Sequence, residues 1–427
     1  MRVGAAASGL VAALALAWSG AAAAASARPP GCRDVPAGVP LQALLDAAAP
    51  GSALCLAAGE HRGPLVVPAG VLLWGSRSAR VVSSGTGSTI RLSGAGAALE
   101  GFTVDGSGAR FEHADAAVRI EADGGRVEGL RIEHALFGIL AERVKRVRIA
   151  RNEISGNAAK ALGLRGDAIR LWEVRGSDVV GNRVEDARDV VAWYAPGNRF
   201  ADNVIARGRY GIHFMYSHDC HVEDNRFDAN VVGVFVMYSR GVVLERNEIQ
   251  RSAGAAGMGI GVKEAGAITI RDNRLVNNTV GLYLDTSPLD RRDHNWIDGN
   301  LLAGHDRAIV FLGGAARNHI RANTLRGNTL QVALEGGGDA LAAEWRGNSF
   351  DDYRGYDLDG DGVGDLPYEP RSLAAEWTQH APALALFRGT PALALVEWLG
   401  AAVPLFRPTT LLIDPSPRMR SEARLAD

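Results

Sequence analysis

Five short segments between Asp167 and Ser287 repeat one pattern: DAIRLW (Asp167–Trp172), DVVAWY (Asp189–Tyr194), YGIHFMYS (Tyr210–Ser217), VGVFVMYS (Val232–Ser239) and VGLYLDTS (Val280–Ser287). A related segment, MGIGVKEA (Met258–Ala265), precedes the last one. Each is followed by a turn, a short apolar pair and an asparagine. These asparagines recur about every 21 to 27 residues: Asn182, Asn203, Asn225, Asn247, Asn273, Asn300, Asn323 and Asn348. A repeat of this size indicates a solenoid.

The content of the repeat selects the kind of solenoid. Helical repeats need about thirty residues and two helices, for which these units have no room, and the leucine scaffold of leucine-rich repeats is missing. We therefore predict an all-β fold, a right-handed parallel β-helix with one coil per repeat. Asparagine side chains stacked at one turn would bond the coils above and below them.

The repeat spans most of the 427 residues, so one elongated domain is expected. Met1–Ala27 is typical of a signal peptide, because an apolar core ends in Ala25-Ser26-Ala27; a membrane anchor is the alternative. We predict an N-terminal cap over 28–59, β-helix repeats over 60–371 and a C-terminal docking tail over 372–427.

The cysteines fit an exported protein. Cys32 and Cys55 flank Leu41–Ala48, a short amphipathic helix pattern, and a disulfide between them would staple the cap of the solenoid in an oxidising compartment. Cys220 aligns with Val242 of the next repeat, which predicts a buried thiol. The net charge of −2 provides no basic stripe and excludes nucleic acid as a partner.

Alignment of the repeats separates inward from outward side chains, since neighbours along a strand alternate between the two faces. The positions predicted to point inward are apolar: Ile169, Val191, Ile212, Val234, Ile260 and Leu282, and Leu171, Trp193, Phe214, Val236, Val262 and Leu284. The positions predicted to point outward are Arg170, Ala192, His213, Phe235, Gly261 and Tyr283, and Trp172, Tyr194, Met215, Met237, Lys263 and Asp285.

Methionine on the outward face predicts a metal. Met215 and Met237 share a column, so their backbones should lie about 4.8 Å apart, the strand spacing. His213 leans from the same face, and two thioethers with one imidazole suit copper(I), bound transiently. Met258, His218 and His221 are weaker copper ligands in this prediction.

The alternative for this face is a metal-free hydrophobic docking ladder, since exposed aromatic side chains call for a partner. Its predicted members are Trp172, Tyr194, Phe235, Tyr283, Lys263 and Asp285. Lys263 beside Glu264 and Asp285 also fits a base that abstracts a proton from a uronate, although a surface ion pair explains the same residues.

The stretch Asn348–Pro370 contains Asp357, Asp359 and Asp361 at alternate positions, with Gly362 and Asp365 beyond them. This spacing predicts a calcium turn without the bidentate glutamate of an EF-hand, because position twelve is Tyr368. An Asp-Gly turn that closes the last coil is the alternative. After Arg371 the repeat ends, and alanine- and leucine-rich runs broken by prolines predict short helices and an extended tail that needs a surface.

The segments RYGIHFMYS, GMGIGVKEA and DDYRGYDLDGDGVGDLPY resemble the NosD family of nitrous-oxide reductase maturation, from about Cys32 to Pro417. The resemblance implies a periplasmic protein, held peripherally at the inner membrane by an ABC transporter (a permease and its ATPase). It also implies copper delivery to nitrous-oxide reductase, with a lipoprotein copper chaperone as donor and no enzymatic activity in this chain. Any ATP use would belong to a partner, since the sequence contains no phosphate-binding loop.

An enzyme is the competing class, because alginate epimerases and polysaccharide lyases carry similar β-helix repeats. The Asp-Pro-His triplet of the epimerases is absent, and the single Asp-Pro is Asp414-Pro415 in the tail. The outward face is also apolar and carries thioethers, where a uronate-binding groove would present Arg and Lys. We therefore favour copper delivery over the enzyme and over the metal-free scaffold.

Overall fold

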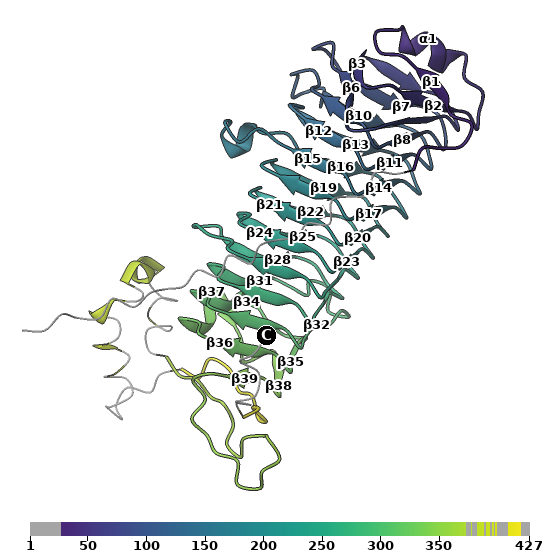
Figure 1. Cartoon of the computed structure of the whole chain (residues 1–427). Helices are drawn as coiled ribbons and strands as arrows, with labels where there is room; N and C mark the ends of the chain where they lie inside the picture. Colours follow the sequence, from purple (N-terminus) through teal and green to yellow (C-terminus); the bar gives the residue numbers. More distant parts are fainter. Residues whose placement is uncertain are drawn as a thin grey trace, which may run out of the picture.

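The chain winds into a long parallel β-helix (Figure 1), described from a computed structural model that covers residues 27–372 and 409–419, with scattered residues between 377 and 398. The predicted fold class is confirmed: in this described part nearly every element is a strand. Apart from Ala27, the predicted signal peptide lies outside the described residues. No described helix is long and apolar enough to cross a membrane.

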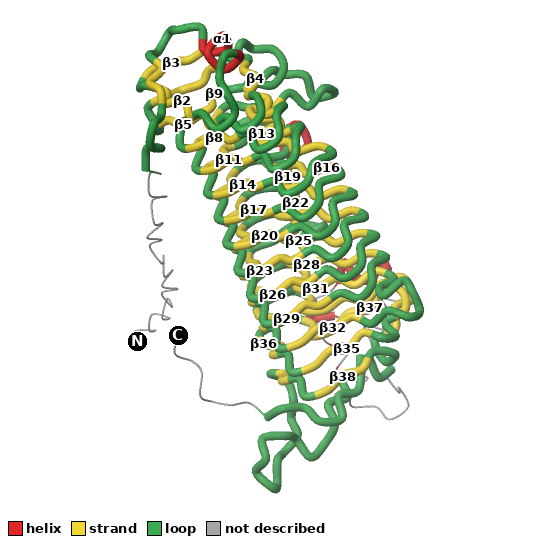
Figure 2. Tube along the Cα trace, turned by 90° about the vertical axis from the view of Figure 1, so that its right-hand side faces the viewer, coloured by secondary structure: helices red, strands yellow, loops and turns green. Residues whose placement is uncertain are grey.

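Three parallel sheets form the sides of the β-helix, and each complete coil contributes one strand to each sheet (Figure 2). Sheet A contains, in spatial order, β1 (Arg33–Val35), β2 (Ala53–Leu56), β5 (Leu72–Gly75), β8 (Ala98–Glu100), β11 (Arg126–Glu128), β14 (Arg148–Ala150), β17 (Asp178–Val180), β20 (Arg199–Ala201), β23 (His221–Glu223), β26 (Val243–Glu245), β29 (Thr269–Arg271), β32 (Asn295–Asp298), β35 (Asn318–Arg321) and β38 (Glu344–Arg346). Sheet B contains β3 (Gly59–Arg62), β6 (Ala79–Val82), β9 (Thr103–Asp105), β12 (Arg131–Glu133), β15 (Glu153–Ser155), β18 (Arg183–Glu185), β21 (Val204–Ala206), β24 (Arg226–Asp228), β27 (Glu248–Gln250), β30 (Arg274–Val276), β33 (Leu301–Ala303), β36 (Thr324–Arg326) and β39 (Ser349–Phe350). Sheet C contains β4 (Leu65–Val67), β7 (Ile90–Leu92), β10 (Ala116–Ile120), β13 (Phe137–Glu142), β16 (Ile169–Trp172), β19 (Asp189–Trp193), β22 (Tyr210–Met215), β25 (Val232–Met237), β28 (Met258–Lys263), β31 (Val280–Asp285), β34 (Arg307–Gly314) and β37 (Leu330–Asp339).

The predicted asparagine ladder is present at the corner between sheets A and B. Each side chain is buried, and its Nδ2 donates to the Oδ1 of the asparagine one coil further on, as from Asn225 to Asn247 at 3.0 Å. The same Oδ1 accepts from the backbone N–H of Asn225. The ladder begins one coil earlier than predicted, at Asn152, and ends on Asp414. These bonds satisfy turn backbone that is out of reach of water.

The residue before each ladder asparagine is small or polar because of its backbone conformation. At Asp202, Asp224 and Arg246 the backbone has φ of 56°, 55° and 53°, the left-handed region. Glycine takes this position at Gly181 and Gly299. Glycine and aspartate tolerate left-handed backbone better than most residues, so the turn geometry selects them.

A column of glycines at the second position of the sheet C strands has a different cause. A Cβ on Gly211 would lie 2.3 Å from the carbonyl oxygen of Gly233, and one on Gly233 would lie 2.5 Å from that of Gly259. Successive coils therefore approach too closely here for any side chain. This close approach explains why glycine follows the first residue of these strands, as in Tyr210-Gly211 and Val232-Gly233.

The first coil is closed by the N-terminal segment. The helix α1 (Leu41–Asp46) buries Leu41 and Leu45, and the Gln42 amide bonds both the N–H and the C=O of Val66 in the edge strand β4. Cys32 and Cys55 form a disulfide, which ties the N-terminal segment to β2. Unpaired backbone at the sheet edge is thereby covered.

At the other end, residues 409–419 of the predicted tail lie against the last coil. They pair with the preceding loop through the bridges Tyr368–Asp414 and Arg371–Thr410. The buried Asp414 carboxylate accepts from the backbone N–H and the Nδ2 of Asn348. Part of the tail therefore closes the β-helix itself, while most of residues 373–408 lies outside the described part of the chain.

Candidate functional site

The outer face of sheet C carries the predicted copper ligands. Met215 pairs with Met237 across β22 and β25, and His213 pairs with Phe235. Both methionines are half-buried and point away from the core, since their neighbours Phe214 and Val236 are core residues. The two thioethers therefore occupy one outward column, as the alignment requires.

The alignment of the preceding coil was wrong by one residue. β19 pairs Ala192 with Phe214 and Trp193 with Met215, with an irregularity between Asp189 and Val191. Ala192 is the core residue, while Trp193 points outward, contrary to the prediction. Val191 shares the outward column of His213 instead of the predicted inward one. A one-residue slip moves every side chain to the other face.

The slip brings the Trp193 indole beside the predicted ligands. The Trp193 Nε1–H donates to His213 Nδ1 at 3.4 Å, and His213 Nε2 lies 3.3 Å from the Met237 sulfur. An indole N–H can only donate, so Nδ1 accepts and the ring proton resides on Nε2, facing the thioether. Tyr210 packs against the same imidazole, with ring centroids 4.7 Å apart.

The surroundings keep His213 neutral. Burial and, to a smaller extent, the charge of Arg209 lower its pKa from 6.5 to about 4, against the opposing charge of Asp167. A neutral imidazole is the form that ligates a metal. The site therefore offers an imidazole nitrogen and a thioether in contact, with a second thioether in register on the adjacent strand.

A buried ion-pair cluster next to β16 supports the outer face of sheet C. Asp167 is fully buried and binds Arg170 at 2.6 Å and Arg188 at 2.7 Å. Burial raises the pKa of Asp167, against the pull of both arginines. Arg170 also lies 5.5 Å from the Trp193 ring centroid, so the cluster helps to orient the indole.

The turn after these strands carries a stack of tyrosines, of which only Tyr194 was predicted to belong to the ladder. Tyr194 and Tyr216 stack with centroids 5.2 Å apart, and Tyr216 and Tyr238 with centroids 5.0 Å apart. Tyr194 and Tyr216 are more than two-fifths exposed. Their spacing of 22 residues, equal to the repeat, is the signal that could have identified the stack. Trp172 extends the tyrosine stack, with its ring centroid 5.7 Å from that of Tyr194.

The remaining members of the predicted ladder lie further along sheet C. Phe235 and Tyr283 are half-buried outward residues in one column. Lys263 binds Asp285 at 2.9 Å on the next strand, and this hydrogen bond raises the pKa of Lys263. A general base needs a lowered lysine pKa, so this pair is an ion pair and does not support proton abstraction.

The weaker copper candidates lie apart from His213. Met258 packs against the outer apolar cluster of Val280, Val310 and Ala333. His218 is exposed in the turn, where its Nδ1 accepts from the Arg240 backbone. His221 belongs to sheet A and binds Glu245 at 3.1 Å.

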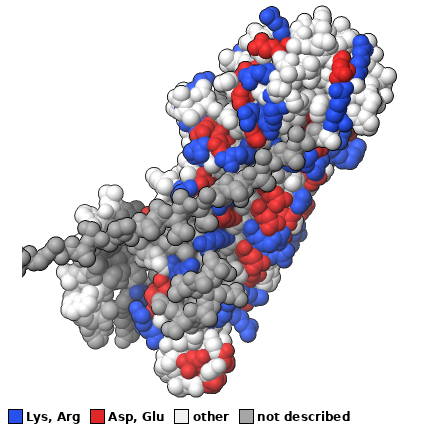
Figure 3. Space-filling view, in the orientation of Figure 1, with Lys and Arg blue, Asp and Glu red and all other residues white. Residues whose placement is uncertain are grey.

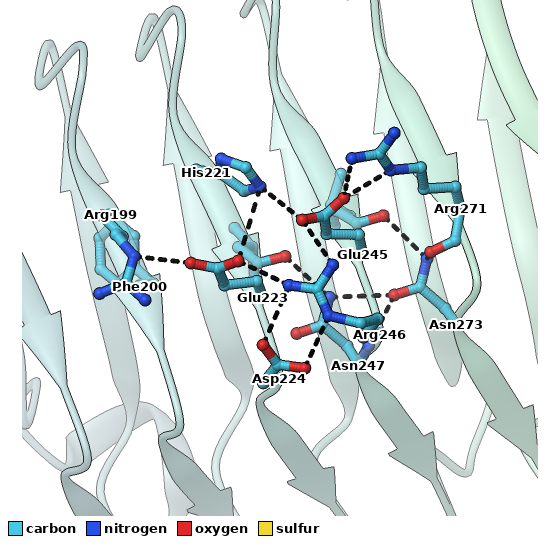
Figure 4. Close-up of polar contacts among 12 residues, drawn as sticks. Arg199, Phe200, His221, Glu223, Asp224, Glu245, Arg246, Asn247, Arg271 and Asn273 are labelled. Atoms are coloured by element: carbon cyan, nitrogen blue, oxygen red, sulfur yellow. Dashed lines mark hydrogen bonds and ion pairs between the residues drawn. The ribbon is translucent and has the colours of Figure 1, made fainter.

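The cluster around His221 has the composition of a metal site but is neutralised by arginines (Figure 4). Glu223 binds Arg199 and Arg246, and Glu245 binds Arg246 and Arg271. Burial alone would raise the pKa of Glu245, yet the hydrogen bonds from Arg246, Arg271 and His221 lower it to about 2. This cluster is therefore an ion-pair ladder. Acidic and basic side chains are also intermixed on the face seen in Figure 3.

The aspartates of the predicted calcium turn converge in the structure. Ligand atoms of Asp357, Asp359 and Asp361 lie within 4.8 Å of one another. Asp357 accepts from the backbone of Gly360 and Gly362, and Asp365 accepts from Leu358. These bonds also fit the Asp-Gly turn that was the alternative, and calcium binding stays a prediction.

Comparison with known proteins supports the likeness noted in the sequence. Residues 150–355 match the family described as "Periplasmic copper-binding protein (NosD)". The chain is 28% identical to the "Probable ABC transporter binding protein NosD" of Pseudomonas aeruginosa, over 86% of this chain and 88% of that protein. It is also 28% identical to the protein of the same name from Stutzerimonas stutzeri, over 82% and 83% of the two chains.

Solved structures with the same fold include two glycosidases. The catalytic domain of a GH87 α-1,3-glucanase in complex with nigerose aligns with a TM-score of 0.55 at 12% identity, over 75% of this chain and 70% of that one. The catalytic unit of the GH87 α-1,3-glucanase of Streptomyces thermodiastaticus aligns with a TM-score of 0.50 at 21% identity, over 77% and 65%. At these identities the likeness shows the β-helix alone. In sequence the chain is thus similar to the NosD proteins, whose family is described as periplasmic and copper-binding and whose two matched members are named as probable binding proteins of ABC transporters.

Proposed function

We propose that this chain is the periplasmic component of an ABC-transporter complex that delivers copper to nitrous-oxide reductase, and that His213, Met215 and Met237 hold the copper(I) in transit. The observation that carries the proposal is the 3.3 Å contact between His213 Nε2 and the Met237 sulfur, with Met215 in register beside it. Soft thioethers and a neutral imidazole select copper(I) over zinc or magnesium, which favour thiolates, imidazoles or carboxylates.

The chemistry of loading is ligand exchange without a change of oxidation state. Copper(I) would replace the ring proton at His213 Nε2, and that proton would move to Nδ1. The move breaks the hydrogen bond from Trp193, which at 3.4 Å is weak, and copper(I) would take the place of the Nε2–H that faces the Met237 sulfur. Release to an acceptor would reverse the same steps, so the site suits an ion held briefly.

The exposed aromatic face around the site supports docking of protein partners. Trp172 and the tyrosine stack of Tyr194, Tyr216 and Tyr238 border the copper ligands on one side. Phe235, Tyr283 and the Lys263–Asp285 pair continue the surface along sheet C. We assign this face to the copper donor, a lipoprotein chaperone, and to the reductase. The transporter permease, with its ATPase, holds the chain peripherally at the inner membrane through the tail.

The copper site is tested by competition between the purified mature protein and a chromogenic copper(I) chelator without oxygen. The variant carrying Met215→Leu and Met237→Leu keeps side-chain volume and removes both sulfurs. We expect it to bind copper(I) about 100-fold more weakly, equivalent to about 2.7 kcal/mol. Met258→Leu, an outward methionine away from His213, should leave the affinity unchanged. Full affinity in the double variant would refute the site and leave the metal-free scaffold.

A further inference from the structure

Two histidines face each other on the outer side of sheet A, away from the copper ligands on sheet C. His319 lies in β35 and His294 directly precedes β32, and these strands are neighbours with β38 at the lower end of Figure 2. His294 Nδ1 lies 2.7 Å from His319 Nε2. The ring centroids are 5.0 Å apart and the planes differ by 23°, so the two nitrogens meet edge to edge.

A carboxylate fixes the tautomer of this pair. His319 Nδ1 lies 2.5 Å from Glu344 Oε2 and donates a hydrogen bond to this carboxylate oxygen. His319 Nε2 therefore presents a lone pair, and His294 donates its Nδ1–H to it. Glu344 also accepts a hydrogen bond from Arg321 at 2.5 Å, so its carboxylate is held between the two side chains.

Packing holds both rings in place. The Trp296 ring stacks on His319 with centroids 4.1 Å apart and planes within 12°. The backbone on both sides of His294 is anchored: Asp293 is buried and binds Arg240 at 2.8 Å, and the buried Asn295 donates to Asn318 at 3.0 Å. His294 itself is exposed, so its ring can turn while its Cα stays fixed.

We propose that His294 Nδ1 and His319 Nε2 bind one divalent metal ion of the copper–zinc class, which takes the place of the proton they share. The displaced proton moves to His294 Nε2, so neither ring changes its charge. Metal–nitrogen bonds of about 2.0 Å at a tetrahedral angle separate two nitrogens by about 3.3 Å, which requires a small outward turn of the exposed His294 ring.

The surroundings match those of metal-binding imidazoles elsewhere. A ligating histidine usually donates its other N–H to a carboxylate, as His319 donates to Glu344. Imidazole ligands suit copper, zinc and nickel, and among divalent ions copper binds such nitrogen sites most tightly. With two protein ligands, the other coordination positions belong to water or to a partner's side chain.

His221 lies on the same sheet as His319 but has different side-chain contacts. His221 and His319 occupy one outward column, which runs through β23, β26, β29, β32 and β35. His221 Nε2 is bound to Glu245, whose charge arginines already satisfy. It has no second imidazole opposite it among the contacts of the described residues. His221 is therefore the matched control.

The experiment uses the mature chain with Met215→Leu and Met237→Leu, so that binding at the proposed copper(I) site is absent and the two proposals fail independently. Zinc and copper(II) salts are titrated into this protein by calorimetry, and copper(II) is followed by electron paramagnetic resonance. We expect His294→Ala and His319→Ala each to weaken one binding event at least about tenfold and to reduce its nitrogen hyperfine pattern from two nitrogens to one. Glu344→Gln should weaken the same event about 10–100-fold, and His221→Ala should leave it unchanged.

Equal binding in the parent, His294→Ala and His319→Ala proteins would overturn the proposal. An equal loss in His221→Ala would overturn it too, because binding would then follow surface histidines in general. Circular dichroism of each variant confirms that the exposed substitutions leave the fold intact.

Discussion

A single indole decides how the candidate copper site differs from its sequence prediction. Trp193 and Ala192 exchange faces because β19 pairs with β22 one residue out of the expected register. The core takes the small Ala192 opposite Phe214, and the larger indole goes to the outer face beside His213. Volume inside the coil explains the choice, since a core filled by Phe200 and Phe214 in contact has room for a methyl group there.

His305 yields a residue-scale prediction about pH. It occupies a buried ladder in which Asn278 contacts its Nδ1 and Asn328 accepts from its backbone N–H. Burial lowers its pKa from 6.5 to about 4, although bonds to Asn278 and Leu275 oppose the shift. Between these two pH values the unfolded chain binds the proton and the folded chain does not. Folding stability therefore falls as pH drops from about 6.5 to about 4, by roughly 3 kcal/mol for this residue.

The variant His305→Asn, which restores the ladder residue, should lose that part of the acid sensitivity. Urea unfolding of both proteins between pH 7.5 and pH 4 measures it. As pH falls, the unfolding free energy of the parent should decrease more than that of the variant, so the variant gains stability relative to the parent. A constant difference across this range would show that His305 titrates normally.

At the scale of the element, the corner between sheets A and B is the unit that repeats most strictly. A left-handed residue and a buried asparagine recur there in each regular coil, as at Asp224 and Asn225. Strand lengths in sheet C vary more, from three residues in β4 to ten in β37. The corner is constrained by hydrogen bonds that must be satisfied inside the protein, whereas a strand needs only alternation.

Removal of one ladder amide tests that constraint. Asn247→Ala would leave the Asn225 N–H, the Val222 carbonyl and the Asn273 amide oxygen without their bonds to this side chain. We expect a loss of at least about 2 kcal/mol in unfolding free energy, since each buried unsatisfied group costs about 1–3 kcal/mol. Chemical denaturation measures the loss.

Asn157→Ala is the matched control, because Asn157 is exposed and, among the contacts of the described residues, its side chain accepts only from the nearby Ala159 N–H. Its effect should stay within about 0.5 kcal/mol. Similar losses in both variants would mean that the ladder is not a main source of stability.

At the scale of the whole molecule, both ends of the β-helix are closed by chain that lies outside the repeat. The helix α1 covers β4 at one end, and Asp414 terminates the asparagine ladder at the other. Stability in a solenoid is close to a sum over neighbouring coils, so the loss of an end should spread only a short way. The strands β22 and β25, which carry the proposed copper ligands, lie several coils from either end (Figure 1).

Asp414→Ala tests this independence. The substitution removes the acceptor of the Asn348 N–H and side-chain amide. We expect amide hydrogen exchange to become faster in β38 and β39 and to stay unchanged in β22 and β25, as mass spectrometry can measure. Faster exchange along the entire chain would instead show that the β-helix opens as one cooperative unit.

The architecture, the asparagine ladder and the shared column of Met215 and Met237 could all be predicted from the amino-acid sequence. All three follow from local periodicity, because a period near 22 residues repeats the same turn and strands alternate their faces. The tertiary structure alone decided the register of β19, the packing of Trp193 on His213, and the meeting of His294 with His319. These contacts depend on the space left between coils and on which rings meet across them, and no pattern along one strand records that space.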